Sequence, residues 1–135
     1  MGFGVIDASL KVEKALPASN TTAVTDGIDL GIGTKGDFLT DAELLISVDA
    51  VATGLLGDAA THKFSVEHDT DSAFGTATAI ALEVLVQTGA GGAGAAAKSG
   101  RFRLPVDVKR YVRVKCTKSD NVNASTKKFY AQLVF

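Results

Sequence analysis

Short runs of alternating apolar and polar residues are the main pattern along the chain. Residues 42–49 place Leu44, Ile46 and Val48 on one side, and residues 61–68 alternate in the same way. Such alternation predicts strands with one buried face and one hydrated face, as in antiparallel sheets. Further segments of this kind lie at residues 101–104, 110–116 and 128–135.

The alanine-rich segment from Thr76 to Gln87 fits either a strand or a short helix. A strand is favoured, because Ile80, Leu82, Val84 and Val86 occupy alternate positions. Turn-forming residues separate the segments, and no long amphipathic helix is indicated. Several short strands with such connectors predict an all-β protein, an antiparallel β-sandwich.

The first 22 residues have a different character. Residues 7–16 are of mixed polarity, and residues 17–22 have the composition of a linker. This segment fits an edge strand, an extended arm that packs on a neighbouring subunit, or a frayed terminus. We divide the chain into an N-terminal arm and linker at residues 1–22 and a single β-sandwich domain at residues 23–135.

Charge is unevenly distributed although the net charge is only −1. Residues 98–128 hold ten of the fourteen basic residues and two acids, about +8, which leaves about −9 for the rest. The asymmetry either orients the protein toward a charged partner or is cancelled when these strands pack beside acidic ones.

Cysteine usage and the chain start bear on the folding compartment. The one cysteine, Cys116, shares a strand side with Val112 and Val114, which predicts a buried apolar residue and excludes an intrachain disulfide. The start of the chain lacks the features of a secretory signal, and no segment is long and apolar enough to span a membrane. We therefore expect folding in a reducing cytoplasm.

Residues 89–94 spell G-x-G-x-x-G, the pattern of a dinucleotide fingerprint. That fingerprint needs a helix whose amino end receives the pyrophosphate. Only residues 95–99 separate Gly94 from Gly100, and Pro105 follows soon after, so no helix of that kind fits. We interpret the segment as a flexible loop that conforms to a partner, and we predict no cofactor.

Metal and catalytic sites are not indicated either. His62 and His68 lie too far apart along one strand to share a metal ion, and we expect both to be capping or surface residues. Asp69 and Asp71 resemble the start of a calcium loop, but its later ligand positions fall on alanine and isoleucine. With no G-x-S-x-G segment and no serine paired with a histidine, we predict a protein that is not an enzyme.

Nucleic-acid binding is the remaining interpretation of the basic segment. A single-strand binder adds exposed aromatic rings to its basic residues, and Tyr111 is the one candidate here. The isoelectric point near 6.1 also argues against a phosphate-driven binder. We predict no direct contact with nucleic acid and none with a membrane.

Five segments occur in an order that resembles the capsid cement (decoration) proteins of short-tailed bacteriophages. The resemblance extends over roughly residues 27–135. The segments are residues 27–31 (GIDLG), 37–48 (DFLTDAELLISV), 63–69 (KFSVEHD), 86–94 (VQTGAGGAG) and 101–114 (RFRLPVDVKRYVRV).

The resemblance implies a jelly-roll-like sandwich that binds outside the expanded phage head as a dimer or trimer. It implies a protein made in the host cytoplasm that clamps the major capsid protein. The alternatives are a carbohydrate-type ligand-binding module, disfavoured by the absence of tryptophan, and another virion structural protein such as a tail component. The expected contact residues, besides the arm, are Gly89, Gly91, Gly92, Gly94, Arg101, Arg103, Lys109 and Arg110.

Overall fold

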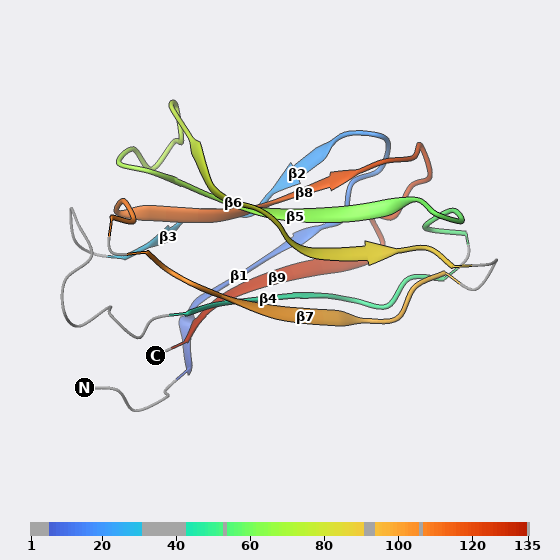
Figure 1. Cartoon of the computed structure of the whole chain (residues 1–135), viewed down its shortest axis with the longest axis horizontal. Coiled ribbons are helices and arrows are strands. Elements are labelled where there is room, and N and C mark those ends of the chain that lie inside the picture. The colour runs from blue at the N-terminus through green and yellow to red at the C-terminus, as the bar shows by residue number, and fades with distance from the viewer. Residues whose placement is uncertain (1–5, 31–42, 53, 91–93, 106, 135) are drawn as a thin grey trace.

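A computed structural model describes residues 6–30, 43–52, 54–90, 94–105 and 107–134 of the chain, and all of its regular elements are strands. Within these ranges there is no helix long and apolar enough to cross a membrane. The strands form two antiparallel sheets stacked face to face (Figure 1). The first sheet has the strand order β1 (Ile6–Ala15), β9 (Lys128–Val134), β4 (Glu43–Val48), β7 (Lys98–Arg103). The second sheet has the order β2 (Thr22–Val24), β8 (Tyr111–Lys118), β5 (Thr61–Asp69), β6 (Thr78–Thr88), and β3 (Ile28–Asp29) also pairs with β8.

The strand order is that of a jelly roll. Sequence neighbours such as β4 and β5 lie in opposite sheets, whereas distant strands such as β1 and β9 are hydrogen-bonded side by side. This arrangement of a four-stranded and a five-stranded sheet arises from paired Greek keys. The predicted fold class, an antiparallel and jelly-roll-like β-sandwich, is confirmed.

The core forms where the predicted alternation directs it. Leu44, Ile46 and Val48 of β4 are buried, and the residues between them are only partly covered. Phe64 of β5 meets Phe129 of β9 edge to face, with ring centroids 5.3 Å apart, which joins the two sheets at the centre. Alternate burial on both sheets therefore produces one continuous hydrophobic core.

The N-terminal segment contributes an edge strand. Residues Ile6–Ala15 form β1, which pairs antiparallel with β9 and closes one side of the first sheet. The sequence left an edge strand and an extended arm open, and residues 6–15 take the edge-strand form. That residues 1–22 reach toward neighbouring subunits stays a prediction.

Strand β6 exists as predicted, but its buried side differs from the expected one. The pattern predicts that the even-numbered apolar residues from Ile80 to Val86 share the inner face. Instead Leu85 and Gln87 are buried and Leu82 is 75% exposed. The register against β5 explains the difference: Leu85 lies opposite buried Phe64 and Ala81 opposite buried Val66, so odd-numbered positions face inward, and Leu82 lies within an irregularity of this pairing.

Candidate binding face

The outer surface of the first sheet gathers polar side chains around one tyrosine. Register places Ser99, Ser47, Tyr130 and Glu13 in one row across β7, β4, β9 and β1. The strand neighbours of Ser47 and Tyr130 are buried in the core, so these two side chains point outward, and their partners in the row share that face. We call this surface the Tyr130 face, and its adjacent row consists of Arg101, Leu45, Gln132 and Lys11.

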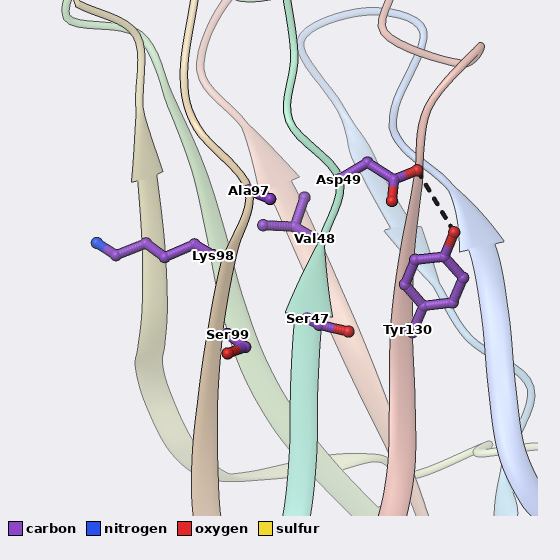
Figure 2. A pocket seen from close by; sticks show the side chains of 7 residues that line it. All are labelled: Ser47, Val48, Asp49, Ala97, Lys98, Ser99 and Tyr130. Atoms are coloured by element: carbon purple, nitrogen blue, oxygen red, sulfur yellow. Dashed lines mark hydrogen bonds between the residues drawn. The ribbon is translucent and has the colours of Figure 1, made fainter.

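A shallow hollow of about 320 Å³ opens on the Tyr130 face where β4 ends and β7 begins. Figure 2 shows the Tyr130 ring on one side of the hollow, with Asp49 above it and Lys98 extending away on the opposite side. The serine hydroxyl groups of Ser47 and Ser99 lie between them. The hollow therefore combines one aromatic ring with several hydrogen-bonding groups.

The contacts of Tyr130 hold its ring in place. Its hydroxyl group donates to Asp49 Oδ2 at 3.4 Å, and the same oxygen accepts the backbone N–H of Lys128 at 3.1 Å. The Lys11 ammonium lies 5.0 Å from the ring centroid. Burial, followed by the Asp49 carboxylate, raises the pKa of Tyr130, so the phenol remains a proton donor at neutral pH.

The Tyr130 face combines hydroxyl groups with charged side chains. The two serines have no histidine beside them, because His62 and His68 belong to the second sheet. Glu13, in the same row, forms an ion pair with Lys128 at 2.8 Å, and this contact lowers the pKa of Glu13. The face offers hydrogen bonds and an aromatic surface to a polar partner.

The four predicted basic contact residues divide between the sheets. Arg101 and Arg103 point outward from edge strand β7 beside the Tyr130 face, and both are exposed. Lys109 and Arg110 precede β8 in the second sheet. The Arg110 guanidinium donates to both carboxylate oxygens of Asp29, at 2.8 and 3.1 Å, and the Lys109 backbone N–H donates to His68 Nδ1 at 3.1 Å. The fold brings these four residues together only in pairs.

The described part of the predicted glycine loop packs against the backbone of the same chain. Gly89 and Gly94 are buried, and a Cβ at either position would collide with a carbonyl oxygen, of Gly57 or Val51 respectively. Gly94 also has φ +69°, which favours glycine. Gly91 and Gly92 lie outside the described residues. The visible glycines have a packing role, and their contact with a partner stays a prediction.

The uneven charge of the sequence is largely balanced by the fold. Basic side chains of residues 98–128 lie beside acids from the rest of the chain, because the jelly roll interleaves these strands. The pairs are Arg101 with Glu43, Arg110 with Asp29, Arg113 and Lys115 with Glu67, and Lys128 with Glu13. Of the two interpretations of the charge pattern, mutual cancellation is the one observed at these pairs.

His62 is buried at the sandwich end, which corrects the expectation of a capping or surface residue. Its Nδ1 donates a hydrogen bond to Gln87 Oε1 at 2.8 Å, so its Nε2 accepts a hydrogen bond from Lys118 Nζ at 3.2 Å. Lys118 is fully buried and also donates to Leu55 O at 2.8 Å and Asp120 Oδ1 at 2.9 Å. Burial lowers the pKa of His62 and keeps the imidazole neutral in this network.

His68 and Asp69 are buried as well, so His68 is also not a surface residue. Asp69 organises the turn after β5: its carboxylate accepts the backbone N–H groups of Asp71 at 3.2 Å and Thr76 at 2.9 Å. These bonds lower the pKa of Asp69 and direct its oxygens to the turn. Across the ranges that the structure covers, no three His, Cys, Asp or Glu side chains gather as metal ligands.

Sequence reasoning missed the centre of the Tyr130 face. The alternation in residues 128–135 contained the signal, since burial of Phe129 and Ala131 requires Tyr130 to point outward. The position of Ser47 and Ser99 beside Tyr130 had no such signal, because register across β7, β4 and β9 joins segments far apart in the chain. Tyr111, the predicted exposed aromatic residue, is half-buried next to the Arg110 guanidinium.

Comparisons with known proteins show the fold and leave the ligand open. No protein-family model matches the chain, and no curated protein sequence matches it. Among solved structures, the chain is similar to the carbohydrate-binding module CBM27-1 of Caldicellulosiruptor saccharolyticus, solved with mannohexaose (9% identity, 96% of this chain and 79% of that chain, TM-score 0.51).

Two further solved structures are similar over most of the chain. They are the CBM32 module of AlyQ with 4,5-unsaturated mannuronic acid (18% identity, 98% and 83% covered, TM-score 0.39) and the xylan-binding module CBM15 (10% identity, 98% and 97% covered, TM-score 0.45). At 9% identity, the similarity to CBM27-1 shows a shared fold alone.

Proposed function

We propose that this chain is a capsid cement protein, a non-catalytic β-sandwich that binds the outside of a mature phage head. The observation that carries the proposal is the series of segments between residues 27 and 114 that resembles the cement proteins of short-tailed phages. The jelly-roll order of the strands is the fold that this resemblance implies. Its partners are the major capsid protein and other copies of this chain.

The surface chemistry supports a protein that acts by binding. The buried polar groups around His62 and Asp69 are bonded within the chain and stabilise the fold. The outward groups, such as Arg101 and Tyr130, are suited to hydrogen bonds and ion pairs with a partner. Many copies on one shell add such contacts together, so a modest affinity for each site suffices. Binding only the mature shell would stabilise that state by mass action.

Capsid shells that lack cement protein provide the test. The purified chain is mixed with expanded and unexpanded shells of the cognate major capsid protein, and bound protein is measured by co-sedimentation and thermal release. We expect retention on expanded shells and loss from unexpanded ones. Failure to bind either shell would contradict the proposal.

Charged contacts are tested on the same shells. The pair Arg101→Ala and Arg103→Ala should weaken retention at low salt, while Lys127→Ala, another exposed cation, serves as the matched control. Equal retention of both variants would exclude β7 as the charged contact.

The Tyr130 face favours glycan binding as a second candidate function. Its single ring, its serine hydroxyl groups and the Asp49 carboxylate are groups that hydrogen-bond to and stack on a sugar. Because the similar module CBM27-1 was solved with mannohexaose, that oligosaccharide is the first ligand to test. The Lys11 ammonium beside the ring would have to move for a sugar to stack there.

Calorimetric titration separates the two candidates. Glycan binding predicts that Tyr130→Ala abolishes the heat of mannohexaose or xylohexaose binding, whereas Tyr111→Ala, at the other tyrosine, preserves it. Absence of binding to both sugars, together with retention on expanded shells, would leave the cement function alone.

A further inference from the structure

The hydrogen bonds of His62 fix the protonation state of its ring. Gln87 Nε2 donates to two backbone carbonyl oxygens, of Asp49 and Ala96, so Gln87 Oε1 must be the acceptor that faces His62. The imidazole therefore donates through Nδ1, and its Nε2 accepts a hydrogen bond from the Lys118 ammonium at 3.2 Å. Both bonds exist together only while the imidazole is neutral.

The charged groups around His62 oppose a second positive charge. In the described part of the chain, the charges that act on the ring are those of Lys118 and Asp120. The Asp120 carboxylate contacts Lys118 Nζ at 2.9 Å, and the group that faces the ring from β6 is the uncharged amide of Gln87. A proton on His62 Nε2 would remove an acceptor from Lys118 and leave two buried cations in contact. Their repulsion is strong because the surrounding dielectric constant is low.

The same ion pair holds the connection between β4 and β5. Lys118 Nζ donates to Leu55 O at 2.8 Å, and Asp120 Oδ2 accepts the Gly57 N–H at 2.9 Å. The side chain between these two contacts, that of Leu56, is buried in the core. The position of this connection therefore depends on where the Lys118 ammonium lies.

The end of β6 is bonded to that connection in turn. The Gly89 N–H donates to Ala60 O at 2.9 Å, and Gly89 O accepts the Ala59 N–H at 2.9 Å. A Cβ at Gly89 would collide with Gly57 O, so the two backbones lie in direct contact. These segments share one end of the sandwich, on the right in Figure 1. We call residues 55–60, 89–90 and 118–120 the loop end.

We propose that His62 is an acid-sensitive clamp: a proton on Nε2 displaces the Lys118 ammonium and releases the loop end, while the central strands stay paired. Histidine is the side chain whose charge changes most readily near neutral pH. The released ammonium keeps Asp120 as its partner and gains water. Release also frees Gly89, the first residue of the predicted contact loop. The clamp belongs to the fold, so it holds whichever partner the protein binds.

Proton linkage gives the size of the effect. Burial lowers the pKa of His62 in the closed state, whereas a hydrated imidazole in the open state regains the ordinary pKa of 6.5. Opening therefore takes up a proton once the pH falls below 6.5. The equilibrium constant for opening should rise up to about tenfold between about pH 7.5 and about pH 5.5.

Amide hydrogen exchange of the full chain, followed by NMR over this pH range, tests the clamp. The N–H groups of Gly57, Ala59 and Gly89 report on the loop end, and that of Val114, bonded to Thr25 Oγ1, reports on global unfolding. Protection is expressed relative to unstructured peptides at each pH. Protection of the loop-end amides should fall up to about tenfold and stay below that of Val114 throughout.

His62→Gln is the matched variant. Glutamine offers one donor and one acceptor but does not titrate, so the acid response of the loop-end amides should disappear. His68→Gln, at the other end of β5, should leave the response unchanged. A response that is absent from the wild-type chain, that persists in His62→Gln or that His68→Gln abolishes would overturn the proposal. So would loop-end amides as well protected as Val114, because opening would then be global.

The wild-type chain alone gives an answer if His62→Gln misfolds. The ring C–H resonance of His62 should titrate below pH 6.5, with the same midpoint as the shifts of the loop-end amides. Different midpoints would overturn the proposal. Retention on capsid shells is measured separately, so failure of the clamp would not be confused with failure of the cement function.

Discussion

Replacement of Lys118 by methionine should be among the most damaging single changes in this protein. The Lys118 side chain is 0% exposed and its ammonium group donates to three acceptors, on Leu55, His62 and Asp120. Methionine retains most of the apolar stem but removes all three donors. His62 Nε2 then loses this donor at a buried site, and Leu55 O loses it at a partly buried one.

The expected loss follows from these contacts. Removal of one partner of a buried ion pair costs about 3–5 kcal/mol, because the remaining charge and acceptors lose their partner. The Asp120 side chain is 22% exposed and can recover some hydration, so we place the loss near the lower end, about 3 kcal/mol. For a chain of 135 residues this corresponds to a fall in Tm of roughly 10 °C.

Urea unfolding, followed by circular dichroism in dilute protein, measures the free energy of unfolding. Lys63→Met is the matched control, since Lys63 is half-exposed and its ion pair with Glu83 should contribute less than about 1 kcal/mol. A loss below about 1 kcal/mol for Lys118→Met, or a loss equal to that of the control, would refute the reasoning about the buried network.

Three further predictions concern single positions. Burial lowers the pKa of His62 from its usual 6.5, so the unfolded chain binds more protons than the folded one and the free energy of unfolding should fall as the pH drops below 6.5. His62→Gln should reduce the slope of unfolding free energy against pH, and an unchanged slope would contradict the assignment. Gly94→Ala should destabilise by about 2 kcal/mol or more in urea unfolding, while Gly54→Ala, with open space around it, stays within about 0.5 kcal/mol. Burial raises the pKa of Cys116 to about 12, so a thiol reagent at about pH 8 should label it only after unfolding, and rapid labelling of the folded protein would count against this.

Much of the fold could be predicted from the sequence because it depends on local pattern. In β4 and β8 the residues that alternate in polarity are the ones that alternate in burial, as in the run from Val112 to Cys116. A side chain in a strand points to one face or the other by its position alone. The all-β class, the sandwich and the buried cysteine follow from this rule.

The candidate sites depend on contacts that local pattern does not contain. Local pattern indicates that Tyr130 points outward, but only the pairing of β9 with β4 places Ser47 beside it. The burial of His62 requires Lys118, 56 residues away, to donate to it. The exposure of Leu82 depends on the register of β6 against β5, which places the odd-numbered residues Leu85 and Ala81 opposite buried ones.

The sequence by itself determined which segments become strands and which of their residues can enter a core, because alternation is a property of neighbours along the chain. Only the tertiary structure decided which polar groups are satisfied inside and which are left on the surface. That choice is made by strand register and its irregularities, which bring together residues far apart in sequence. Their free energies come from contacts formed only on folding.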